Sequence, residues 1–149
     1  MSDEDPSLTE LAATFPAGAT LLNVGVDVIE VERVQRVYDR QKDRFLKRVF
    51  TQEEQDYCFS KSNPFPHLAA RFAAKEAVSK AFSTGIGRLF SWKSSSIYHG
   101  PRMQPMVRLD EQGLALLNAV SGTDVRITLS HTKTTAVAVA VLVKVEEGE

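Results

Sequence analysis

The segment Ala136–Val143 has the sequence AVAVAVLV and constrains the fold more than any other part of the chain. Its eight residues cannot cross a bilayer, which takes about 20 apolar residues in a helix. Alternate side chains of a strand point to opposite faces, so both faces of this segment are apolar. A strand with one face in water would show polar residues there. We therefore expect a helix to cover one face, and either the same chain or a second subunit to cover the other.

The remaining patterns predict a small sheet and several helices. Leu21–Ile29 alternates with a period of two, as a strand does. Thr51 and Glu54 have the spacing of a capping box, so a helix is expected to begin there. Other strands are expected at 92–98, 106–109, 124–130 and 135–145, and helices at 31–50, 67–82 and 111–121. Because these do not alternate as βαβ units, the predicted class is α+β, with a small antiparallel sheet packed against helices.

The chain is long enough for one domain, which we place at 21–149. Residues 1–20 form an acidic extension that we expect to be flexible, with a helical turn at 8–14. The N-terminus has no basic segment followed by an apolar core, so it does not resemble a signal peptide, and no membrane partner is expected. Cys58 is the single cysteine and cannot form an internal disulfide. A reducing compartment, the cytoplasm, is therefore predicted.

Charge is unevenly distributed along a chain whose net charge is only −1. Residues 1–32 hold seven acidic and no basic side chains, whereas residues 33–48 hold seven basic and two acidic ones. In a continuous helix the following cations would lie along one side: Arg33, Arg36, Arg40, Arg44 and Lys47. Such a row is either a solvated face or a docking surface for an acidic partner. Near-neutral charge and the lack of interleaved aromatic residues argue against nucleic acid.

Four residues are candidates for chemistry. Asp27 lies in an otherwise apolar strand, where its carboxylate is either a favourable charge for the next helix or a metal ligand. Glu76 and Lys80 are four residues apart and share a helix face. They form either an ordinary surface pair or the floor of a cleft flanked by apolar side chains. His131, expected in a hairpin turn, is either simply exposed or functional. Magnesium prefers carboxylate oxygens and adds water and phosphate, so Asp27 and Glu76 could hold Mg²⁺ while Lys80 neutralises phosphate.

Five blocks along the chain resemble those of the holo-acyl-carrier-protein synthase family, the short trimeric type of 4'-phosphopantetheinyl transferase. They occur in the family's order and cover residues 21–145. The blocks are GVDVIE with Arg33, RVFTQEE from Arg48, RFAAKEAVSKA from Arg71, TGIG from Thr84 and ITLSH ending at His131. The resemblance implies the 4'-phosphopantetheinyl transferase fold. It also implies transfer of 4'-phosphopantetheine from coenzyme A to a serine of apo acyl carrier protein, releasing 3',5'-ADP, in fatty acid biosynthesis.

The resemblance also implies a role for each matched residue. Asp27 and Glu76 would be the Mg²⁺ ligands and, with Lys80, the catalytic residues. Four residues would bind coenzyme A: Arg71, Lys80, Gly85 and His131. The proton acceptor would be Glu76 or a metal-bound water.

The implied partners are an acyl carrier protein, which would dock on Arg33, Arg36, Arg40 and Arg44, and two further copies of the chain in a homotrimer with active sites between subunits. The alternative function is a catalytically silent module of the same fold that binds carrier proteins.

Overall fold

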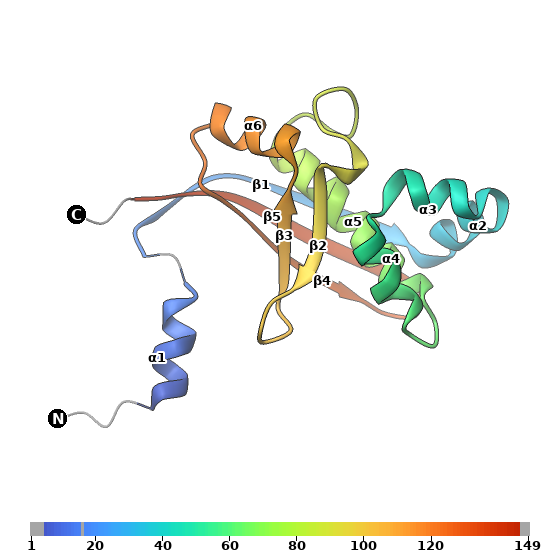
Figure 1. The fold of residues 1–149 in the computed structure, drawn as a ribbon, viewed down its shortest axis with the longest axis horizontal. Helices are drawn as coiled ribbons and strands as arrows, with labels where there is room; N and C mark the ends of the chain where they lie inside the picture. Colours follow the sequence, from blue (N-terminus) through green and yellow to red (C-terminus); the bar gives the residue numbers. More distant parts are fainter. Residues whose placement is uncertain (1–4, 16, 147–149) are drawn as a thin grey trace.

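A computed structural model of the chain describes residues 5–15 and 17–146. Figure 1 shows the elements in chain order. The helices are α1 (Pro6–Ala13), α2 (Val31–Gln41), α3 (Asp43–Val49), α4 (Gln52–Phe59), α5 (Phe65–Ala81) and α6 (Glu111–Ala119), with a 3-10 turn, η1, at Trp92–Ser94. The strands are β1 (Ala19–Glu30), β2 (Ser95–His99), β3 (Pro105–Leu109), β4 (Asp124–His131) and β5 (Thr135–Val145). In this part of the chain no helix is long and apolar enough to span a membrane.

The apolar segment forms the middle strand of a three-stranded antiparallel sheet with the order β1-β5-β4. Its register pairs Asp27 of β1 with Ala138 of β5, and Ala138 with Leu129 of β4. Strands β2 and β3 form a separate antiparallel hairpin. The predicted α+β class and the small antiparallel sheet are confirmed.

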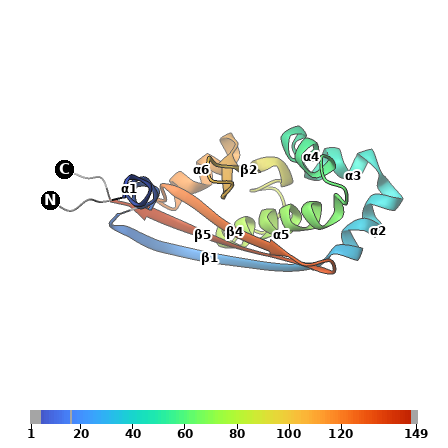
Figure 2. The same cartoon turned by 90° about the horizontal axis from the view of Figure 1, so that it is seen from below.

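Helix α5 covers one face of this sheet, as Figure 2 shows from below. Small side chains make the close approach possible, because the inner face of β5 consists largely of alanines that are at most 1% exposed. At Gly25 of β1, an added Cβ would lie 2.0 Å from the carbonyl oxygen of Ala77. Backbone therefore packs on backbone at this crossing, and any residue other than glycine at position 25 would push the helix away.

The opposite face of the sheet is apolar and open. Val24, Val26 and Val28 of β1 are 46%, 51% and 62% exposed. They pair with Val141, Val139 and Val137 of β5, which are only partly buried. No described element covers this face (Figure 2). The prediction of a helix on one face is confirmed, and the alternative in which the same chain covers both faces is wrong for the residues described.

Three predicted boundaries are corrected. The strand expected at 92–98 begins only at Ser95, because residues 92–94 form the 3-10 turn η1. The single helix expected at 31–50 is broken at Lys42, whose φ of 49° is left-handed, so α2 and α3 are separate. Residues 39–44 carry no apolar side chain, so no packing holds a continuous helix there. His131 ends β4, paired with Ala136, rather than lying in the turn. The capping box of Thr51 and Glu54 is confirmed, with both of its hydrogen bonds present.

Candidate active site

The predicted catalytic residues meet where α5 crosses β1. Lys80 Nζ lies 2.9 Å from Asp27 Oδ1 and donates a second hydrogen bond of 3.0 Å to the carbonyl oxygen of Val26. The Lys80 side chain is 50% exposed and that of Asp27 17%. Residues 53 positions apart are therefore joined at a place that solvent, and hence a ligand, reaches.

Glu76 belongs to the same cluster. Burial raises the pKa of its carboxyl, and the negative charge of Asp27 raises it further, while Lys80 and Arg33 act in the opposite direction. Glu76 and Asp27 are thus close enough to repel each other, which is the situation that a bound cation relieves. Among the described residues no group of three or more possible metal ligands occurs. A cation held by this pair would complete its shell with water or substrate oxygens, as Mg²⁺ does.

A second cluster lies at the opposite end of α5 and contains all three histidines of the chain. The rings of His67 and His131 are 4.8 Å apart between centroids, and the rings of Tyr57 and His99 are 4.5 Å apart. Burial is the first cause that lowers the pKa of His67, and the neighbouring His131 is the second. Burial and the nearby Arg71 lower the pKa of His99.

Only His131 of this cluster was predicted from the sequence. His67, His99 and Tyr57 come from three different elements, and no local spacing links them.

Arg71 organises the histidine cluster rather than presenting its charge to water. Its side chain is 2% exposed, and its guanidinium lies 4.2 Å from the centroid of the Tyr57 ring. Nη1 donates to the carbonyl oxygen of His67 at 3.3 Å, while the buried Nε has no partner among the described residues. The cation therefore raises the local positive potential around the histidines, which suits an anion.

Gly85 lies just beyond the end of α5. Its φ of 64° is left-handed, and a Cβ there would meet no atom within 4 Å. Its amide donates to the carbonyl oxygen of Ser79 at 3.2 Å. Glycine is thus favoured here by the backbone conformation and not by crowding.

The predicted docking cations are exposed but divided between two helices. α2 carries Arg33, Arg36 and Arg40, and α3 carries Arg44 and Lys47. The three α2 arginines line a hollow of about 490 Å³. The positive charge of Arg33 also lowers the pKa of Glu76, so this basic surface adjoins the carboxylates.

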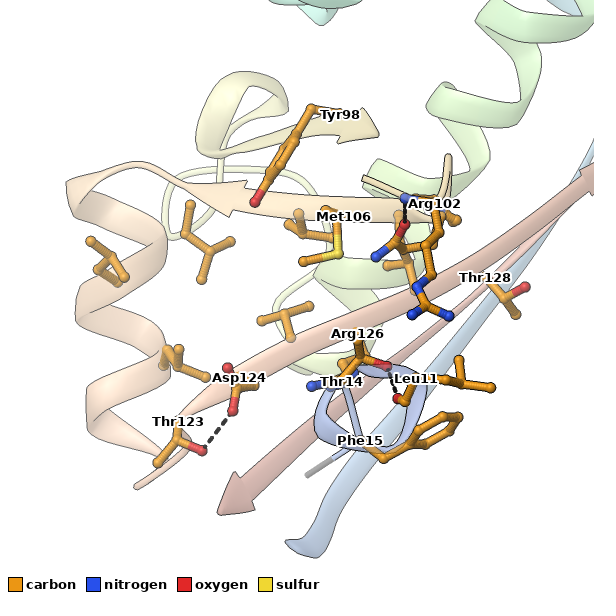
Figure 3. A pocket seen from close by; sticks show the side chains of 18 residues that line it. Leu11, Thr14, Phe15, Tyr98, Arg102, Met106, Thr123, Asp124, Arg126 and Thr128 are labelled. Atoms are coloured by element: carbon orange, nitrogen blue, oxygen red, sulfur yellow. Dashed lines mark hydrogen bonds between the residues drawn. The ribbon is translucent and has the colours of Figure 1, made fainter. Parts of the chain in front are cut away.

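A larger pocket of about 890 Å³ lies elsewhere, between α1, β3, β4 and α6 (Figure 3). Its labelled side chains include Leu11 and Phe15 beside α1, with Met106 of β3 and Arg126 of β4. Of the described residues that line it, none belongs to the predicted site. This pocket is therefore separate from the predicted catalytic residues.

The comparisons agree with this fold. Residues 23–140 match the family model of the 4'-phosphopantetheinyl transferase superfamily. A holo-[acyl-carrier-protein] synthase of Chlamydia trachomatis serovar L2 is 48% identical over 81% of this chain and 98% of its own length. A crystal structure of the Neisseria meningitidis holo-[acyl-carrier-protein] synthase has a TM-score of 0.77 at 28% identity, covering 83% of this chain and 98% of that one.

A second crystal structure is of the Helicobacter pylori holo-[acyl-carrier-protein] synthase in complex with coenzyme A. It has a TM-score of 0.71 at 28% identity and covers 80% of this chain and 98% of that one. The chain belongs to the 4'-phosphopantetheinyl transferase superfamily. Within it, the relatives named above are holo-acyl-carrier-protein synthases. Helix α1 lies outside the matched residues.

Proposed function

We propose that this protein is a Mg²⁺-dependent holo-acyl-carrier-protein synthase. It transfers 4'-phosphopantetheine from coenzyme A to a serine of apo acyl carrier protein and releases 3',5'-ADP. The observation that carries the proposal is the meeting of Asp27, Glu76 and Lys80 at one accessible crossing of α5 and β1. A silent binding module would not need two mutually repelling carboxylates beside an exposed lysine, because it holds no cation and transfers no phosphate.

Asp27 and Glu76 would hold the magnesium ion. Their oxygen donors fit a hard cation, and the contribution of the Asp27 charge to the raised pKa of Glu76 supports a site shared by the two carboxylates. When bound, the ion would neutralise charge on the diphosphate and help it to leave. The proton of the serine hydroxyl would pass to Glu76 or to a metal-bound water, since a serine hydroxyl is a poor nucleophile without a base.

Coenzyme A would lie along α5, between the two clusters. Lys80 is half exposed, so its ammonium can turn from Asp27 toward a diphosphate. The amide of Gly85 lies beyond the same end of the helix. His131, with His67 and the buried Arg71 beneath it, offers a positive region for a further phosphate group. The coenzyme complex of the Helicobacter pylori relative supports coenzyme A as the donor.

The carrier protein would dock on the basic surface of α2 and α3. Carrier recognition through positive charge would be steered over long range and weakened by salt. Because Arg33 acts on the pKa of Glu76, a carrier bound here would bring its serine near the carboxylates. We place the reaction in fatty acid biosynthesis and in the cytoplasm, as the family resemblance implies.

We further propose a homotrimer that buries the open valine face of the sheet. Contiguous exposed apolar patches of this kind mark interaction sites. A ring of three would repeat one heterologous contact until it closes. The number three rests on the family resemblance, and the exposed residues Val24, Val26 and Val28 support a covering neighbour. Light scattering should give three times the chain mass, and a monomer mass with full activity would contradict the proposal.

Mixed oligomers test whether active sites are shared between subunits. Asp27→Ala and His131→Ala proteins should each be inactive, and mixing them after partial dissociation should restore some activity if the two residues serve one site from different subunits. Activity that stays at background in the mixed trimers would show that each site is built within one chain.

The mass of a carrier protein tests the function directly. Apo carrier incubated with coenzyme A, Mg²⁺ and this protein should gain the mass of one phosphopantetheine group. A carrier whose acceptor serine is replaced by alanine should gain nothing, and neither should the wild-type carrier in excess chelator. Binding of the carrier without any change in its mass would favour the silent module.

A further inference from the structure

An ion pair between Lys75 and Glu54 lies entirely inside the chain. Lys75 Nζ is 2.8 Å from Glu54 Oε1, and both side chains are 0% exposed. Lys75 comes from α5 and Glu54 from α4, so the pair ties the helix that carries Glu76 to its neighbour. Burying two charges is costly unless every polar atom finds a partner.

The network around this pair is well satisfied. Lys75 Nζ also donates to the carbonyl oxygens of Trp92 and Ser95, which use its remaining protons. Glu54 Oε2 accepts from the amide of Ile97 at 2.9 Å, and Oε1 accepts from the amide of Thr51 at 2.8 Å. The pair therefore locks α5 simultaneously to α4, η1 and β2.

Elsewhere α5 meets the sheet mainly through small side chains, with hydrogen bonds at its C-terminal end from Asn23 to the carbonyl oxygen of Ala81 at 2.7 Å and from Lys80 to that of Val26 at 3.0 Å. The sheet-facing side of α5 consists mainly of alanines, which have no side-chain torsions and raise no ridges to interlock with the sheet. Gly25 sets how closely α5 approaches β1, but a smooth contact does not set how far the helix turns about its axis. Phe72 packs on Trp92 with ring centroids 4.7 Å apart, on the side of α5 that faces away from Gly25.

A small rotation of α5 would disturb the carboxylate pair. Lys75 and Glu76 are neighbours in sequence and point about 100° apart around the helix. A rotation of about 10° would move a side-chain tip roughly 6 Å from the axis by about 1 Å. A misplacement of about 1 Å can cost about 10²-fold in rate.

We propose that the buried Lys75–Glu54 pair is a positioning element that fixes the rotation of α5 and so holds Glu76 toward Asp27. The inference rests on the proposed function, because it concerns the geometry of that same site. Neither Lys75 nor Glu54 touches substrate in this account. They act through Glu76, so removal of both charges should lower the rate and the metal affinity.

The test compares Glu54→Gln/Lys75→Met with a matched core variant, Leu117→Ala. The double variant removes both charges and keeps the volume nearly constant, but it takes the Lys75 donor from the carbonyl oxygens of Trp92 and Ser95, so a lower melting temperature is expected as well. Leu117 is 7% exposed and lies on α6, so its truncation lowers stability without touching the carboxylates. For each protein we would measure the melting temperature, kcat and KM for both substrates, and Mn²⁺ affinity by calorimetry without substrates.

We expect the double variant to lose about 10- to 100-fold in kcat and about 10-fold in Mn²⁺ affinity, with both KM values nearly unchanged. Leu117→Ala should melt at a lower temperature but keep the wild-type kcat and Mn²⁺ affinity when assayed well below its melting point. A double variant with wild-type kcat and wild-type Mn²⁺ affinity would overturn the positioning role. If wild-type protein transfers nothing, the proposed function itself fails, which is a separate result.

Lys75→Arg keeps the inference testable if the double variant does not fold. Arginine retains the charge but carries a larger planar group that cannot take the place of the ammonium between the same carbonyl oxygens. We expect it to fold and to lose about 10-fold in both kcat and Mn²⁺ affinity, because α5 must rotate to admit the guanidinium. A folded Lys75→Arg protein with wild-type values would overturn the positioning role equally well.

Discussion

Two lysines of α5 form ion pairs of almost equal length in very different surroundings. Lys75 lies 2.8 Å from Glu54 with both side chains fully buried, and Lys80 lies 2.9 Å from Asp27 with its side chain 50% exposed. Burial is the first cause that lowers the pKa of Lys75. The buried pair is closed to ligands by its own network, whereas the exposed pair can exchange its partner for a phosphate. Distance alone does not separate a structural pair from a functional one, but solvent access does.

Loss of a carboxylate should lower the activity most at the site of the exposed pair. We expect Asp27→Ala or Glu76→Ala to lower kcat by at least about 10³-fold, because either change would remove one of the two proposed Mg²⁺ ligands. The fold should be retained, since both residues lie at an accessible crossing. Glu111→Ala, an exposed acid on α6, serves as the control and should keep the wild-type rate. Full activity of both site variants in the presence of a chelator would disprove the metal assignment.

Loss of one partner should lower the stability of the protein more in the buried pair than in the exposed pair. Lys75→Met leaves Glu54 buried without its cation, and we expect the free energy of unfolding to fall by about 3–5 kcal/mol. Lys80→Met breaks a partly exposed pair and should cost less than about 1 kcal/mol. Urea unfolding of the two variants measures the difference. Equal losses would show that the contrast in burial has no energetic consequence.

For catalysis the order of the two lysines should be reversed, so that loss of the exposed Lys80 has the larger effect. Lys80→Ala removes the positive charge that we propose neutralises the phosphates, and we expect the rate to fall by about 10²–10³. Single-turnover transfer measured with saturating coenzyme A separates this effect from weaker binding. An unchanged rate with only a small loss of helix stability would mean that Lys80 is an ordinary surface partner of Asp27.

The basic surface beside the exposed pair should affect carrier binding and little else. We expect Arg33→Glu/Arg40→Glu to raise KM for the carrier by about tenfold or more at low salt. KM for coenzyme A should change little. Lys144→Glu, an exposed cation at the end of β5, is the matched control. The effect should shrink as ionic strength rises, and equal changes in both KM values would count against a docking surface.

Local sequence patterns predicted the fold well, because each relies on a short-range rule. The period of two identified β1, and the apolar run at 136–143 identified a strand with two apolar faces, which is the middle strand of the sheet. The break at Lys42 was missed because neither glycine nor proline marks it. The backbone there bends where no apolar contact resists, which a helix-length pattern does not reveal.

The candidate site was predicted mainly from family motifs, and the contacts that hold it were not. Asp27, Glu76 and Lys80 were candidates from residue type and spacing alone, but each also fitted an ordinary structural role, and the resemblance decided between the two. Glu54 was identified only as a capping residue, although its other oxygen satisfies a buried amide and its charge pairs with Lys75. Such a pairing depends on how α4 packs against α5, and no signal within either helix encodes it.

The location of a bound divalent ion tests the central claim most directly. Crystals grown with coenzyme A and Mn²⁺ should show a strong anomalous peak within coordination distance of both the Asp27 and the Glu76 carboxylates. Lys80 should then have left Asp27 for a diphosphate oxygen. A peak elsewhere, or coenzyme A bound with Lys80 still paired to Asp27 and no metal at the carboxylates, would contradict the account.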